Sequence, residues 1–100
     1  MASLEEQFHH AMLGVYENAK QHAYFATYFK RMIDQYKGLE AAKRLLAVPE
    51  IQEGLMKLWE LKQLGHSMEA FVIQERFRSL FTAAEIAEAR RRLEELGYSQ

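Results

Sequence analysis

The sequence predicts a single all-α domain over residues 1–100, folded as a compact irregular bundle of five or six short helices. The strong helix formers Ala, Leu, Glu, Lys, Arg, Met and Gln fill 63 of the 100 positions, whereas Val, Ile and Thr fill only nine. Apolar residues also recur at the three- and four-residue spacing of a helix. Two capping boxes, Ser3 with Glu6 and Thr82 with Glu85, mark helix starts.

The first predicted helix begins at Ser3, and its apolar residues fall on one face. Gly14 lies inside this stripe, where a glycine costs about 1 kcal/mol relative to alanine, so we expect a close helix contact there. The stripe predicts a helix packed on a core through Leu4, Phe8, Ala11, Met12, Val15, Tyr16 and Ala19.

A second apolar stripe is out of phase with the first and covers about half of the helix circumference. A continuous helix over residues 3–37 would be about 52 Å long, which exceeds the width of a compact domain of this size. We therefore predict a break near residues 20–22, and Gly38 is expected to end the second helix. The second stripe contains Tyr24, Phe25, Tyr28, Phe29, Met32, Ile33 and Tyr36.

Two short helices are expected next. Residues 39–46 predict a third helix that stops before Pro49, because a proline disfavours helical backbone in the residue before it. Pro49 suits the first turn of a fourth helix, which is expected to close near Leu64. The apolar face of that helix contains Ile51, Leu55, Leu58, Trp59 and Leu61.

The C-terminal third predicts two more helices. Ser67 is a suitable N-cap for a short helix that reaches Ile73. The last helix starts after Thr82 and ends at Gly97. Within it, Glu88 stands four residues before Arg92, the favourable order for an ion pair.

Four segments together resemble a widespread family of short, stand-alone bacterial proteins with no established function. They are SLEEQFHHAMLGVYENAK, YFKRMIDQYKGLEAAKRLL, GLMKLWELKQLGHSMEAFVI and FRSLFTAAEIAEARRRLEELGY. The resemblance implies a bacterial, cytoplasmic, all-helical protein and brings no catalytic residues. This family usually has a glycine pair where Lys37 and Gly38 stand, and an acidic residue where this chain has Gly65 and His66.

Composition excludes several classes of protein. The chain has no cysteine, so it has no disulfide, thiol nucleophile or thiolate metal site. The N-terminal MASLEEQFHH lacks the layout of a secretory signal, and no apolar run is long enough to span a bilayer. The net charge is −1 and neither half is strongly basic. We therefore expect a cytoplasmic protein that does not bind membranes.

No constellation of residues predicts catalysis. Glu6-x-x-His9 has metal-like spacing, but a carboxylate di-iron site needs a second such pair, which the chain lacks. No serine elbow, phosphate-binding glycine loop or H-E-x-x-H motif is present. The sequence predicts a protein that is not an enzyme, with no metal, cofactor or small-molecule substrate.

Two surfaces are candidates for binding. The aromatic stretch 23–29 predicts either a central core helix or an exposed patch around Tyr24 and Tyr28, with Trp59 in the core or at the rim of the same patch. The leading hypothesis is a module that binds a protein partner or itself, as a homodimer, through this patch. The alternative is a nucleic-acid-associated factor that uses Arg76, Arg78, Arg90, Arg91 and Arg92, although interspersed glutamates favour a solvated face.

Overall fold

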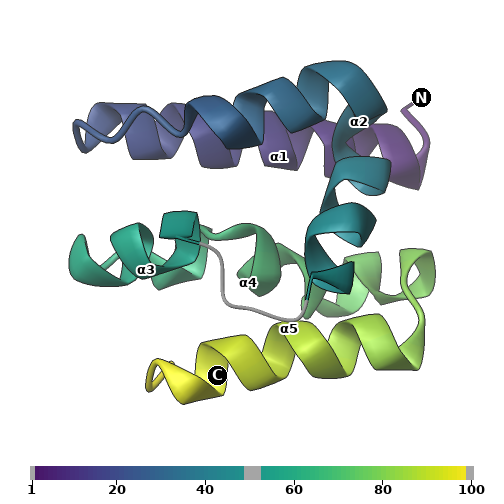
Figure 1. Ribbon diagram of the computed structural model, residues 1–100. Helices are drawn as coiled ribbons and strands as arrows, with labels where there is room; N and C mark the ends of the chain where they lie inside the picture. The colour runs from purple at the N-terminus through teal and green to yellow at the C-terminus, as the bar shows by residue number, and fades with distance from the viewer. Residues whose placement is uncertain (1, 49–52, 99–100) are drawn as a thin grey trace.

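The computed structural model describes residues 2–48 and 53–98, which form an all-α bundle (Figure 1). The predicted fold class is therefore confirmed. The bundle measures 34 × 25 × 22 Å. Over the described residues its elements are five α-helices, α1 (Leu4–Gln21), α2 (Thr27–Ala47), α3 (Glu53–Glu60), α4 (Met68–Val72) and α5 (Ala83–Glu95), and two 3-10 helices, η1 (Leu64–His66) and η2 (Glu75–Leu80).

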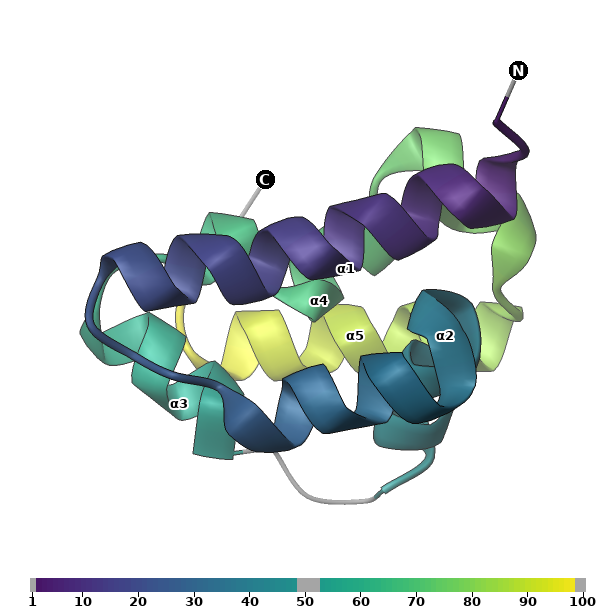
Figure 2. The same ribbon diagram turned by 90° about the horizontal axis from the view of Figure 1, so that it is seen from above.

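The helices form layers around one core. In Figure 1, α1 and the first half of α2 form one layer, α5 lies on the opposite side, and α3 and α4 lie between them. Figure 2 shows α1 running beside the first half of α2. The ring of Phe8 on α1 meets the rings of Phe77 and Phe81 edge-on, at centroid distances of 5.1 and 5.2 Å. These rings join α1 to the segment that leads into α5.

The predicted helix starts that depend on a capping side chain are confirmed for α1, α4 and α5. Ser3 and Glu6 form a reciprocal capping box at the start of α1, and Thr82 forms one with Glu85 at the start of α5. The Ser67 hydroxyl accepts a hydrogen bond from the Ala70 N–H and caps α4. After α5, Gly97 takes a φ of 82°, a conformation that favours glycine.

The break between the first two helices is also confirmed, because α1 ends at Gln21. The prediction that Tyr24 and Phe25 belong to the second helix is wrong, since α2 begins at Thr27. The chain turns through Ala23, which has a φ of 64°. Tyr24 and Phe25 therefore lie on a non-helical connection between α1 and α2.

The second and third predicted helices are the two halves of α2, which bends sharply at Lys37. This residue has a φ of 69° and a ψ of 166°. The first half of α2 therefore ends at Lys37, one residue before the expected Gly38, and Gly38 begins the second half and packs on α1. A Cβ at Gly38 would lie 2.6 Å from the His9 Cα, whereas a Cβ at Gly14 would meet no atom within 4 Å. The close helix contact is at Gly38, and its expected place at Gly14 was wrong.

The fourth predicted helix is shorter than expected. Its proposed start at Pro49 lies outside the described residues, and α3 ends at Glu60. Lys62, with a φ of 60°, then turns the chain toward η1. Among the described residues, none of the helices combines the length and apolar character needed to cross a membrane.

Candidate functional site

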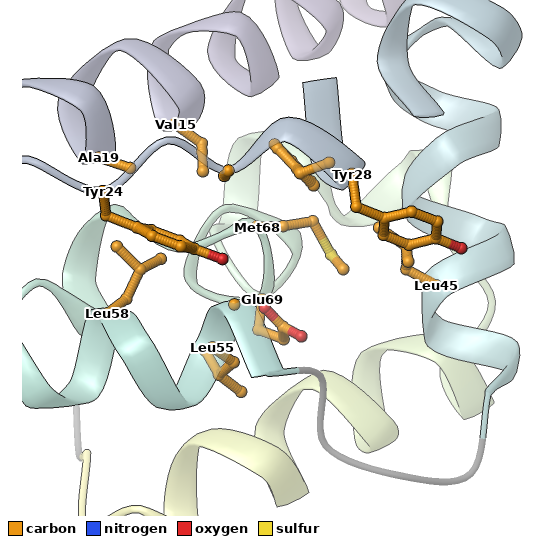
Figure 3. A pocket seen from close by; sticks show the side chains of 12 residues that line it. Val15, Ala19, Tyr24, Tyr28, Leu45, Leu55, Leu58, Met68 and Glu69 are labelled. Carbon is orange, nitrogen blue, oxygen red and sulfur yellow. The ribbon is translucent and has the colours of Figure 1, made fainter. Parts of the chain in front are cut away.

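A pocket of about 260 Å³ opens where the α1–α2 connection passes over α3 (Figure 3). Four helices and the connection contribute its walls, which are mostly apolar. We call it the aromatic pocket and define it by Val15, Ala19, Tyr24, Ala26, Tyr28, Phe29, Leu45, Gly54, Leu55, Leu58, Met68 and Glu69.

The turn after α1 positions the first aromatic wall. The backbone N–H of Ala23 donates to the Lys20 carbonyl at 3.0 Å, and the N–H of Tyr24 donates to the Ala19 carbonyl at 2.9 Å. This turn directs the Tyr24 ring across the pocket (Figure 3). The Tyr24 hydroxyl oxygen would lie 3.4 Å from a Cβ at Gly54, so the glycine leaves room for it beside α3.

Two large aromatic side chains are exposed at this end of the bundle. Tyr28, on the first turn of α2, lines the pocket and keeps 59% of its surface exposed. Phe25, on the connection, keeps 61% exposed. Tyr24 and Phe29 are half-buried, and Ile33, one turn further along α2, is buried. The aromatic stretch is thus divided between core and surface, and the structure brings Tyr24 and Tyr28 together in one pocket.

A buried carboxylate lines the inner part of the pocket. Glu69, on α4, is only 3% exposed. Its burial raises the pKa of the carboxyl, although Arg92 acts in the opposite direction with its Nη1 3.3 Å from Glu69 Oε2. The pocket therefore has a mostly apolar wall and one carboxylate.

Arg92 holds this carboxylate and the end of α2 at the same time. Its side chain is fully buried. Its Nε donates to Glu88 Oε2 at 2.6 Å, which confirms the predicted Glu88–Arg92 pair. Its Nη2 donates to the carbonyls of Leu45 and Leu46 at 3.2 and 3.4 Å, and to that of Val48. These carbonyls end α2, so the cation caps the negative end of that helix.

The same network perturbs Glu88. Hydrogen bonds from Arg91, and after them from Arg92, lower the pKa of Glu88 to about 2, even though partial burial acts the other way. Arg91 also donates to Glu95 at 2.8 Å. One face of α5 is therefore a network of matched charges.

This network corrects part of the nucleic-acid alternative. Arg92 is in the core and is not available to a phosphate, and Arg91 is held by two glutamates. Arg76 lies over the Phe77 ring, with its Cζ 4.3 Å from the ring centroid. Of the five arginines, the structure places two, Arg78 and Arg90, in one shallow hollow.

Trp59 occupies a different hollow from Tyr24 and Tyr28. It lies on α3, is 46% exposed, and lines a shallow depression with Lys62, Leu96 and Tyr98. It is not among the residues that line the aromatic pocket. The expected patch around Tyr24 and Tyr28 therefore does not have Trp59 in its wall.

The Glu6 and His9 pair has other partners. Glu6 Oε1 accepts from the Ser3 N–H at 3.3 Å, and His9 Nδ1 accepts from the Gly38 N–H at 2.8 Å. Over residues 2–48 and 53–98, no group of three or more potential ligands could hold a metal ion. This pair thus serves helix capping and helix packing.

Sequence reasoning missed the role of Glu69 and misassigned Arg92. A signal for Arg92 exists, because it follows Ala89 by three residues and so lies beside the apolar seam of α5. Glu69 is the acid in the short apolar helix MEAFV, where a carboxylate requires a partner.

Comparison with protein-family models, curated proteins and solved structures gave no match. The family resemblance stays a prediction.

Proposed function

We propose that this chain is a non-enzymatic binding module that recognises a protein partner through the aromatic pocket. In this proposal one apolar side chain of the partner enters the pocket, and Phe25 and Tyr28 contact the partner residues on either side of that side chain. The single observation that carries the proposal is a mostly apolar pocket beside two large aromatic side chains that are more than half exposed. We further propose that the protein acts in the bacterial cytoplasm.

The size of the pocket supports one anchoring side chain. Its volume of about 260 Å³ is below the range of about 300–1,000 Å³ that is typical of small-molecule sites. Protein interfaces commonly depend on a few aromatic or apolar anchors that fill pockets near the centre of the contact. An inserted side chain would displace water from the exposed part of the Tyr28 ring.

The exposed rings support a protein surface as the partner. Tyrosine and phenylalanine are enriched in the cores of interfaces, because they bury a large area with few rotatable bonds. Phe25 and Tyr28 have both properties and are held by the turn and by the first turn of α2. The nucleic-acid alternative has less support, because Arg92 is buried and Arg91 is paired.

A photo-crosslinking residue at position 25 tests this proposal in cells. A discrete adduct is expected from position 25, and Tyr28→Ala in the same chain should weaken it. The matched control places the crosslinker at position 59, which is exposed but lines another hollow. An adduct with twice the mass of the chain would identify the partner as a second copy. Equal adducts from both positions, unaffected by Tyr28→Ala, would contradict the proposal.

A further inference from the structure

Gly14 has no explanation in the packing of the bundle. It lies in the interior of α1, where glycine is destabilising relative to alanine. No other element of the described structure approaches it: a Cβ at this position would meet none of their atoms within 4 Å. Its backbone conformation is also ordinary, since Gly14 is not among the described residues with positive φ. Open space therefore lies directly above this residue.

That space belongs to a second hollow, on the side of α1 that faces η1, α4 and η2. We call it the α1–η2 hollow and define it by Gln7, His10, Ala11, Gly14, Val15, His66, Phe71 and Arg76. Its volume is about 500 Å³, within the range of small-molecule sites. The hollow is shallow, and its polar residues are exposed.

The charge of this hollow has one sign. His10, His66 and Arg76 come from three different elements and line it together, and no carboxylate is among the described residues of its lining. Within the described parts of the chain, none of these three side chains takes part in an ion pair, whereas Arg91 and Arg92 each have two. The Arg76 guanidinium is held over the Phe77 ring. No carboxylate of residues 2–48 or 53–98 forms an ion pair with this guanidinium.

We propose that the α1–η2 hollow binds a small organic oxyanion, a phosphate or carboxylate group carried on an apolar body. The guanidinium of Arg76 presents paired N–H donors that match such an oxyanion. His10, His66 and the Gln7 amide supply further donors. Phe71, Ala11 and the unsubstituted Cα of Gly14 form an apolar floor for the rest of the ligand. Among the described lining residues, this hollow shares only Val15 with the aromatic pocket.

Titration with phenyl phosphate, followed by amide NMR shifts at pH 6, tests the proposal. We expect saturable shifts at Gly14 and Phe71. Phenol, which has the same ring without the charge, should give no saturable shifts. Benzoate distinguishes a site for any oxyanion from one that prefers phosphate: equal binding indicates the first and weaker binding the second, and both outcomes support the proposal.

Matched variants separate this site from general attraction of anions. Arg76→Gln should weaken phenyl phosphate binding about tenfold, because it removes a charge-assisted hydrogen bond. Arg78→Gln removes the same charge from the same 3-10 helix but lies at another hollow, and should change binding less than about twofold. Both side chains are exposed, so both variants are expected to fold.

Gly14→Ala gives an independent test. The added methyl group projects into the hollow, so binding should weaken about fivefold or more while the melting temperature rises by about 4–8 °C. A purely structural glycine would give the rise in stability without any change in binding. The proposal is overturned if phenyl phosphate gives no saturable shifts, if phenol binds equally well, or if Arg76→Gln and Arg78→Gln have the same effect.

Discussion

Arg92 and Glu69 form a buried ion pair, with Nη1 3.3 Å from Oε2, that joins α5 to the wall of the aromatic pocket. Both side chains are almost completely removed from solvent. The same arginine caps α2 through three carbonyls. One side chain thus connects α2, α4 and α5.

Loss of this arginine should be strongly destabilising. Arg92→Met leaves Glu69 buried without its cation, and we expect the free energy of unfolding to fall by about 3–5 kcal/mol. Combining it with Glu69→Leu removes the unpaired charge, so the double variant should be more stable than the sum of the single effects by at least about 1 kcal/mol. Urea unfolding followed by circular dichroism measures this coupling, and strict additivity would contradict the pair.

The depressed pKa of Glu88 predicts an acid-sensitive contribution to stability. Because the folded pKa is about 2 and the ordinary value is 4.5, the ionised carboxylate stabilises the fold above about pH 4.5, and this stabilisation is lost as the pH falls toward 2. Glu88→Gln should cost about 1–2 kcal/mol at pH 7, allowing for solvent screening of this partly exposed group.

Unfolding measured from pH 7 to pH 2.5 checks this. The penalty of Glu88→Gln should shrink over the acid part of the range, while Glu95→Gln, in an exposed pair with Arg91, should cost little at any pH. The contribution of Glu69 to stability has the opposite pH dependence. Because its pKa is raised in the folded state, the free energy of unfolding that it contributes increases as the pH falls. A penalty for Glu88→Gln that does not change with pH would contradict the assignment.

Lys37 occupies a backbone conformation that is almost restricted to glycine. Lys37→Gly should therefore raise the free energy of unfolding by about 1 kcal/mol, after the extra entropy of a glycine in the unfolded chain is taken into account. Lys37→Ala keeps the Cβ and should give no such gain. Thermal unfolding of the two variants decides this, and equal stabilities would argue against strain at residue 37.

Alanine substitutions at Gly14 and Gly38 should change the free energy of unfolding in opposite directions, because only Gly38 contacts another helix. Gly38→Ala forces a Cβ against the His9 backbone and should destabilise the protein by about 1–3 kcal/mol. Gly14→Ala meets open space and should stabilise it by about 1 kcal/mol. Both values come from urea unfolding, and changes of the same sign would contradict the contact at Gly38.

Sequence reasoning succeeded where the determinants are local. The starts at Ser3, Ser67 and Thr82 depend on side chains that cap amides three residues away, and Gly97 depends on its own backbone freedom. The break after α1 followed from two stripes that could not share one neighbour. The caps and Gly97 were predictable because they need no knowledge of how the helices pack, and the break needed only the rule that one straight helix cannot bury two stripes on one neighbour.

The errors concern contacts between distant segments. Helical spacing could not show that the turn at Ala23 removes Tyr24 from α2, or that Gly38 rather than Gly14 touches another helix. Arg92 reads as a surface residue within Arg90–Arg92 until Glu69, 23 residues away, is brought beside it. Within the site, Tyr24 and Tyr28 were predicted as neighbours, whereas Glu69 was not predicted at all.

The central claim is tested most directly by purifying the partner that crosslinking identifies and measuring its affinity for the unchanged chain, Tyr28→Ala and Trp59→Ala. Isothermal titration should show that Tyr28→Ala raises the Kd by about 30-fold or more, the loss typical of a hot-spot residue, because it removes an aromatic wall of the pocket. Trp59→Ala should leave the Kd within about twofold of the unchanged chain. Equal losses for the two variants, or no loss for Tyr28→Ala, would show that the aromatic pocket is not the binding site.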